Sequence, residues 1–161
     1  MKKMYGSLVI GAVSVLALVF YIASPGEQAT AVATLTPNDK AVASLGKEIY
    51  AQNCASCHGT KLEGQANWRQ RDANGYMVAP PHNESGHSWH HSDDYLFSMT
   101  KYGIEKMIGK KYPNNMPLYE GQLSDEKIIA ALSYIKSTWP RRIQLQHDQI
   151  NIRAKAYNKY D

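Results

Sequence analysis

The segment Cys54-Ala55-Ser56-Cys57-His58 constrains this chain more than any other feature, because it holds both cysteines of the sequence. A Cys-x-x-Cys-His spacing is the one that attaches a c-type haem. At the end of a helix, the two thiols can each bond one vinyl-derived carbon of the porphyrin, and the imidazole that follows can reach under the iron. We therefore expect one covalent haem c held by Cys54 and Cys57, with His58 as an iron ligand.

Two other uses of such a cysteine pair fit the sequence less well. A thioredoxin-like redox dithiol would need βαβ patterning around the pair, and that patterning is missing. A zinc site would need a second pair of Cys or His at metal-ligand spacing. Since both cysteines belong to the box, no disulfide framework is left.

Length and charge narrow the class of protein. A chain of 161 residues allows one domain plus extensions. Its net charge of +4 is too small to indicate nucleic-acid binding, and the clustered basic and aromatic pattern of such proteins is missing. We expect neither a nucleic-acid partner nor a small-molecule substrate.

The first residues predict export from the cytoplasm. Two lysines precede an uncharged apolar run over residues 8–23, which is either a cleaved signal peptide or a retained anchor. As a helix, residues 4–23 would span ~30 Å, enough for a bilayer core. Cleavage after position 23 would place the bulky Tyr21 near the cut, which favours an anchor over residues 1–23. The lysines then stay inside, and the rest of the chain lies in the periplasm on a single-pass helix of a bacterial inner membrane.

Residues 24–35 have no apolar period and are predicted to form a flexible tether. Thr36 as a cap and Pro37 at the first helical position then predict a helix that runs into the haem box. Its apolar face is expected to carry Val42, Leu45 and Ile49.

Two later segments carry equally clear helix signals. Ser92 is expected to cap a helix from Asp93 to Tyr102, which Gly103 stops. Ser124 is expected to start another helix, which ends at Trp139-Pro140. That helix should have one apolar face formed by Ile128, Leu132 and Ile135.

The remaining segments give weaker signals. Asn74-Gly75, between residues 68–71 and 76–78, favours a small β-hairpin after the haem box. Residues 140–161 form a basic extension with Ile143, Ile150 and Tyr157 at roughly helical offsets. This extension is either a helix that packs on the domain or an arm that lies on a partner.

Three segments make the chain resemble the class I c-type cytochromes over roughly residues 40–139: Gly46 to Gly59 with the haem box, Asn115-Met116-Pro117, and Leu123 to Lys136. The resemblance implies an all-α fold around one covalent haem, with the cytochrome domain over residues 36–139. In that family a glycine of the first helix meets an aromatic residue of the last helix. Gly46 and Tyr134 hold the matching positions, and a residue without Cβ permits such a close crossing.

The resemblance also implies His58 as the proximal iron ligand and Met116 as the distal one. A thioether is a better partner for Fe(II) than for Fe(III), so it raises the reduction potential. It also fills the sixth coordination site, which argues against a peroxidase-like enzyme. The other candidate methionines, Met77, Met99 and Met107, are expected to fill the core.

Residues 79–91 hold four of the six histidines, namely His82, His87, His90 and His91. One hypothesis is a second metal site, for which copper is plausible. Another is a distal histidine that replaces Met116. The favoured one is a set of loop residues that bond haem propionates and backbone, with Trp68 and Trp89 edging the haem pocket, because no repeated spacing points to one centre. A similar segment occurs in a subset of membrane-bound bacterial monohaem cytochromes, which this chain resembles.

Together these observations predict a single-electron carrier, not an enzyme, between a quinol-oxidising complex and a terminal oxidase or periplasmic reductase. The alternatives are a permanent haem subunit of a larger membrane redox complex, a peroxidase-like enzyme and a copper-linked redox protein. Four lysines flank the Met116 segment: Lys101, Lys106, Lys110 and Lys111. They either steer a redox partner to the haem edge or form an ordinary solvated face.

Overall fold

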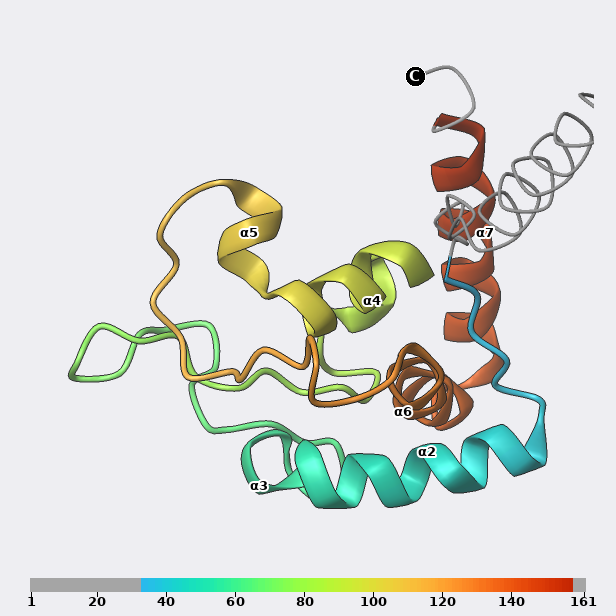
Figure 1. The fold of residues 1–161 in the computed structure, drawn as a ribbon, viewed down its shortest axis with the longest axis horizontal. Helices are drawn as coiled ribbons and strands as arrows, with labels where there is room; N and C mark the ends of the chain where they lie inside the picture. The colour runs from blue at the N-terminus through green and yellow to red at the C-terminus, as the bar shows by residue number, and fades with distance from the viewer. Residues whose placement is uncertain (1–32, 158–161) are drawn as a thin grey trace, which may run out of the picture. The chain divides into compact units, whose positions relative to one another are not determined.

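The computed structural model describes residues 33–157, and its regular elements are helices (Figure 1). In chain order these are α2 (Lys40–Asn53), α3 (Ala55–His58), the 3₁₀ helix η1 (Ser88–His90), α4 (Asp93–Tyr102), α5 (Ile104–Ile108), α6 (Asp125–Ser137) and α7 (Arg141–Tyr157). No strand forms within this range, which agrees with the all-α expectation.

The first predicted helix starts later than its sequence signals suggested. Thr36 does not cap it. Residues 36–39 form a turn in which the Asp39 amide donates to the Thr36 carbonyl oxygen over 3.1 Å. The Asp39 carboxylate then accepts from the amides of Ala41 and Val42 and caps α2. A carboxylate there can take two of the amide groups that a helix start leaves without partners, so Asp39 is the better cap.

The other two helix predictions are confirmed at both ends. Ser92 accepts a hydrogen bond from the Tyr95 amide at the start of α4, and Gly103 follows its last residue. Ser124 accepts from the Lys127 amide at the start of α6, which ends just before Thr138 and Trp139. Acidic residues fill the first turn of both helices, where they complement the helix dipole.

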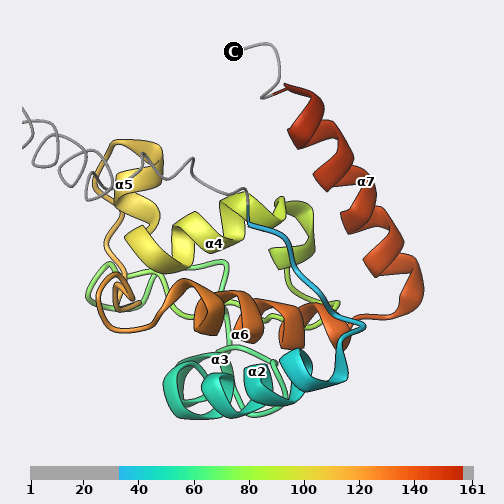
Figure 2. The ribbon, with the colours of Figure 1, turned by 45° about the vertical axis from the view of Figure 1, so that its right-hand side comes forward.

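Helices α2 and α6 cross at Gly46 with almost no space between their backbones. A Cβ atom built on Gly46 would overlap the carbonyl oxygen of Ala130 and lie 2.9 Å from Cβ of Tyr134. The predicted meeting of Gly46 with Tyr134 is confirmed, although the tightest contact is with the Ala130 backbone. In Figures 1 and 2, α6 lies between α2 and α4. The crossing at Gly46 therefore fixes α2 against the middle one of these three helices.

The apolar face of α6 is the one predicted, whereas that of α2 is shifted. Ile128, Leu132 and Ile135 are buried, as expected. On α2 the buried residues are Gly46, Ile49 and Tyr50, and Leu45 is 44% exposed. Because α6 approaches α2 at Gly46, the buried face of α2 is the one that carries Gly46 and Tyr50. The spacing of large apolar residues alone does not reveal this.

The predicted β-hairpin is reduced to a single antiparallel bridge between Arg71 and Met77. The Asp72 amide donates to the Tyr76 carbonyl oxygen, and Asn74-Gly75 forms the turn. The sequence therefore predicted the position of the turn correctly, although the flanking strands do not form. Met77 also pairs in parallel with Asn114 from the segment that follows α5. This second partner ties the turn to the Met116 segment.

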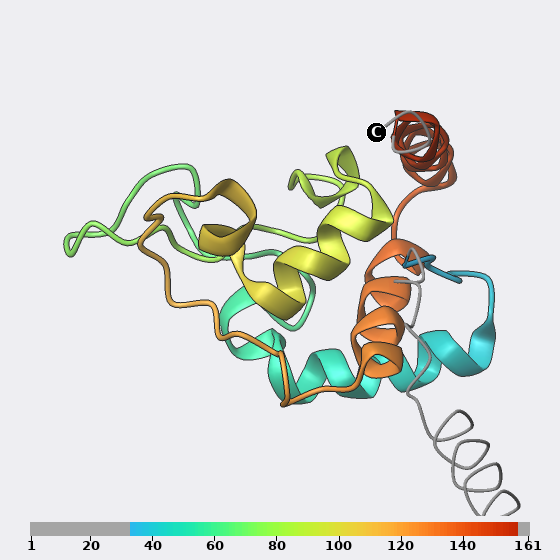
Figure 3. The same ribbon diagram turned by 45° about the horizontal axis from the view of Figure 1, so that its top comes forward.

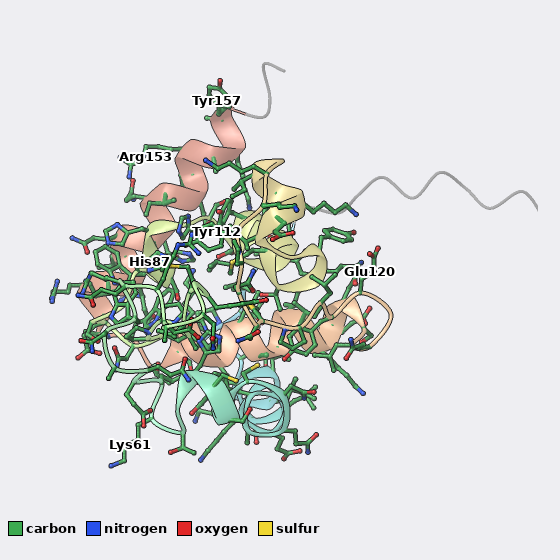
Figure 4. The ribbon with its side chains drawn as sticks, turned by 90° about the vertical axis from the view of Figure 1, so that its left-hand side faces the viewer. Lys61, His87, Tyr112, Glu120, Arg153 and Tyr157 are labelled. Atoms are coloured by element: carbon green, nitrogen blue, oxygen red, sulfur yellow. The ribbon has the colours of Figure 1, made fainter. Side chains whose placement is uncertain are left out.

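Within the basic extension, residues 141–157 form α7, whose first half packs on the domain; Figure 2 shows this helix leaving the end of α6, and Figure 3 views it end-on. Ile143 and His147 are buried, and the contacts of α7 include η1. Farther along, Ile152 is 59% and Tyr157 73% exposed. Figure 4 shows Arg153 and Tyr157 on this outer part of the helix.

A buried ionic group, which we call the Asp93 network, fastens α7 to the domain. The carboxylate of Asp93 accepts from the amide of Leu35 over 2.9 Å and from Nδ2 of Asn151 over 3.0 Å. Lys136 pairs with Asp148 at 2.7 Å, and its Nζ lies 4.0 Å from Asp93. The network therefore joins the segment before α2 to α4, α6 and α7.

The anchor predicted over residues 1–23 lies outside the described residues. Across residues 33–157, none of the helices combines the length and the apolar character that a bilayer crossing requires.

We expect Gly46→Ala to destabilise the protein by about 1–3 kcal/mol, because the added methyl group has to push apart the backbones of α2 and α6. Denaturant unfolding of the haem-loaded protein, followed by circular dichroism, measures this. Ala51→Ser on the exposed side of the same helix is the control and should change the unfolding free energy by less than about 0.5 kcal/mol. Equal midpoints for Gly46→Ala and the wild type would show that the crossing tolerates a Cβ.

Candidate haem site

The haem box lies on a cavity of about 1040 Å³ in the middle of the domain. Cys54, Cys57, His58 and Met116 all line it, together with residues of α4, α5 and α6. This volume lies at the upper end of ordinary small-molecule sites, which suits a large flat cofactor. The structure thus brings the four predicted site residues to one cavity.

The box takes its shape from the end of α2. Cys54 is the C-cap of α2, and its amide donates to the Tyr50 carbonyl oxygen. The chain then makes the single turn of α3, in which the His58 amide donates to the Cys54 carbonyl oxygen over 2.9 Å. Gly59 ends this turn at a φ of 83°, a conformation that favours glycine.

The two cysteines differ in environment. Cys57 is exposed, whereas Cys54 is half-buried and lies close to Tyr119. Burial raises the pKa of the Cys54 thiol to about 11. The Tyr119 hydroxyl donates to the Asn53 carbonyl oxygen over 2.6 Å, and this bond ties the chain after Met116 to the last residue of α2.

The imidazole of His58 is buried, and a hydrogen bond holds one edge of the ring. Its Nδ1 lies 2.9 Å from the Pro80 carbonyl oxygen, which can only accept. Nδ1 therefore carries the proton, and Nε2 is left with a free lone pair, the state in which histidine binds a metal. Burial lowers the pKa of His58, so the ring stays neutral and its chemistry suits the iron of a haem.

Met116 lies on the same cavity, but it is not alone there. Its amide donates to the Asn114 side chain over 3.0 Å, and the residue packs against the core. Met77 and Met99, which the sequence placed in the core, also line the cavity, whereas Met107 is 36% exposed. The fold therefore offers three methionines where the sequence favoured one.

The four histidines of residues 79–91 have different surroundings. His82 is buried, and His87 and His91 also line the cavity. His90 stacks on Trp89 instead. Burial lowers the pKa of His82 well below its usual range and also lowers those of His87 and His91. No group of three metal-binding side chains occurs within residues 33–157, so the geometry there gives the copper hypothesis no support.

The two tryptophans expected at the pocket edge, Trp68 and Trp89, also have different surroundings. Trp68 lines the cavity and stacks on His87 with ring centroids 5.2 Å apart. Trp89 does not line the cavity; it packs against the core, and its Nε1 donates to the Glu84 carbonyl oxygen. A third tryptophan, Trp139 at the end of α6, lines the cavity, although the sequence indicated only that it ends the helix.

The lysines near Met116 do not form one uniform face. Lys101 is paired with Asp125 at 2.7 Å. Lys106 lines the cavity, while Lys110 and Lys111 line a neighbouring hollow of about 740 Å³ together with Arg71. His87 and Tyr112, both labelled in Figure 4, line both spaces. Lys106, Lys110 and Lys111 therefore place positive charge at the cavity and beside it.

A family model for cytochrome c matches residues 43–139, so the chain belongs to the cytochrome c family, whose members bind haem c covalently. The all-α fold and the Cys-x-x-Cys-His box place it with the class I c-type cytochromes, proteins of haem-based electron transfer.

Among curated proteins, a Cbb3-type cytochrome c oxidase subunit FixPc from Rhizobium leguminosarum bv. viciae is 46% identical over 33 residues. That match covers 20% of this chain and 12% of the relative, so it spans about an eighth of that protein. No solved structure matches the chain.

Proposed function

We propose that this protein is a single-electron carrier whose haem iron is bound by His58 on one side and Met116 on the other. One observation carries the proposal: both side chains line the cavity of the haem box, and the Pro80 carbonyl leaves Nε2 of His58 free for a metal. The haem supplies a one-electron iron couple when bound. His58 and Met116 would hold the iron, and the chain supplies a largely apolar cavity around it.

Met116 is favoured over Met77 and Met99 by its backbone. It lies in a segment without helix, is followed by a proline, and has its amide fixed by Asn114. Met99 belongs to α4, and the backbone of Met77 takes part in two β-bridges, one with Arg71 and one with Asn114. A ligand in a pinned, Pro-flanked loop can approach a metal without moving a helix.

We also propose that residues 1–23 hold the protein at the periplasmic face of a bacterial inner membrane. There it would pass electrons from a quinol-oxidising complex to a terminal oxidase or a periplasmic reductase. The uncharged apolar run behind two lysines supports this placement.

A second candidate is a permanent haem subunit of a larger membrane redox complex. The similarity to a subunit of a cbb3-type oxidase favours it, as does the outer part of α7, where Ile152 and Tyr157 face solvent. Extraction of native membranes in mild detergent followed by sizing distinguishes the two: a carrier elutes alone, and a subunit elutes with its complex.

Met116→Ala should keep the haem, because both thioethers and His58 remain, but it should lower the reduction potential, because the thioether favours Fe(II). The ferric protein should also lose its long-wavelength sulfur-to-iron absorption band. Potentiometry and absorption spectroscopy measure these changes. Met77→Ala and Met99→Ala are the matched controls, since both residues line the same cavity, and they should leave the band in place at a packing cost of roughly 2–5 kcal/mol where the side chain is buried.

Loss of the band in Met77→Ala or Met99→Ala, with retention in Met116→Ala, would reassign the distal ligand. If no methionine substitution affects the iron spectrum and a substitution of His87 or His91 does, the iron has two histidine ligands. An open sixth site in the wild type, with rapid peroxide turnover, would favour the peroxidase-like alternative.

If lysines beside the cavity steer negatively charged partners, the triple change of Lys106, Lys110 and Lys111 to Glu should slow oxidation of the reduced protein by ferricyanide at low salt. The difference should shrink above ~0.1 M salt, where charges are screened beyond ~10 Å. Stopped-flow absorption measures the rate. A matched control changes Lys40, Lys47 and Lys127 on α2 and α6 to Glu, with the same change in net charge. Equal slowing in both triple variants would mean that only net charge matters.

Intact-mass measurement of the haem-loaded protein tests the anchor. We expect the mass of all 161 residues plus one haem, because the apolar run has a poor cleavage site. A chain that begins near residues 30–34 would show that the segment is a signal peptide, and it would leave the electron-transfer proposal intact.

A further inference from the structure

One buried contact joins the histidine-rich segment to the proposed iron ligand. The imidazole of His82 stacks on that of His58, with ring centroids 4.0 Å apart and planes 22° apart. We propose that His82 is a positioning residue, which fixes the rotation of the His58 ring about its bond to the haem iron. The proposal rests on the role of His58 as an iron ligand.

The hydrogen bond from His58 to Pro80 leaves this rotation incompletely defined. It fixes where Nδ1 points, but a carbonyl oxygen accepts hydrogen bonds over a broad range of directions. The ring can therefore tilt without losing the bond. A flat group against one face of the ring removes that freedom, and His82 is such a group.

His82 can serve as a reference because three hydrogen bonds hold it to other parts of the fold. Its Nδ1 lies 2.8 Å from the Ser88 hydroxyl of η1, and its amide donates to the Leu62 carbonyl oxygen. Its own carbonyl oxygen accepts from Nε1 of Trp139 over 2.7 Å. The Tyr50 ring also meets it edge-on, 6.3 Å between centroids.

The residues around His82 give the loop little room to move. A Cβ built on Gly86 would overlap the carbonyl oxygen of Pro81, so the chain folds back directly over the residue before His82. Pro80 and Pro81 have fixed φ angles. The run Pro80-Pro81-His82 thus presents a carbonyl to one edge of His58 and a ring to its face.

The choice of histidine has a physical reason. A leucine would fill the space but has no flat face, and a phenylalanine has the face but no ring nitrogen for Ser88. Histidine provides both a flat surface and a polar atom that the Ser88 hydroxyl can hold. Groups behind a metal ligand that fix its orientation are known to tune the metal.

The test uses the ferric haem-loaded protein, because the orientation of the iron ligands, the His58 imidazole among them, affects how unpaired electron density divides among the haem pyrroles. The proton NMR shifts of the four haem methyl groups report that division. We expect His82→Ala to change the order or spread of these shifts and to lower the midpoint potential, since water can reach the released ring. His90→Ala is the matched control from the same segment, and it should change neither, because His90 stacks on Trp89 away from the cavity.

Two milder variants support the test if His82→Ala does not mature. Ser88→Ala keeps the stacked ring and removes its hydrogen bond, and His82→Phe keeps a flat ring without the nitrogen. Both should shift the same methyl resonances by a smaller amount than His82→Ala. Methyl shifts and potentials equal to those of the wild type in all the His82 and Ser88 variants that mature would overturn the proposal.

His58→Ala separates this proposal from the one on which it rests. If it leaves the iron spectrum unchanged, His58 is not a ligand and both proposals fail. If it changes the spectrum while the His82 variants keep wild-type methyl shifts, only the positioning role fails.

Discussion

The close crossing of α2 and α6 at Gly46 is the contact on which the rest of the structure depends. It brings the backbone of α2 against Ala130, and the end of α2 delivers the haem box. The end of α6 delivers Trp139, whose indole holds the carbonyl of His82. Because Gly46 has no side chain, the two helices can approach this closely, and their approach sets the distance between the end of α2 and the end of α6, which together build the site.

A second constraint is electrostatic and lies on the other side of α6. Asp93 and Lys136 are both nearly buried, and such charges are costly unless each has partners. Asp93 has the Leu35 amide and Asn151, and Lys136 has Asp148. Removal of Lys136 would take away the buried ammonium group that lies 4.0 Å from the Asp93 carboxylate, so the network favours a single arrangement of the elements it joins.

The same network reaches the haem cavity through His147, whose Nε2 lies 3.6 Å from the Asp93 carboxylate. This ring is fully buried, and its Nε2 lies 2.8 Å from the His91 carbonyl oxygen. Burial is the main cause that lowers the pKa of His147, and the positive charge of Lys136 lowers it further. The ring is therefore neutral and donates through Nε2. Because His91 lines the cavity, α7 supports the cavity wall although it lies beyond the part that matches the family.

The sequence by itself determined the chemistry and most of the helices. A fixed spacing of Cys54, Cys57 and His58 requires a particular cofactor, and capping at Ser92 and Ser124 acts over three residues, so local order was enough to predict both. Only the tertiary structure decided which groups meet across distance: Tyr50 in place of Leu45 in the core, three methionines on one cavity, and His82 against His58. Those pairings depend on how closely two backbones approach and where a loop returns, and no local pattern of residues contains that information.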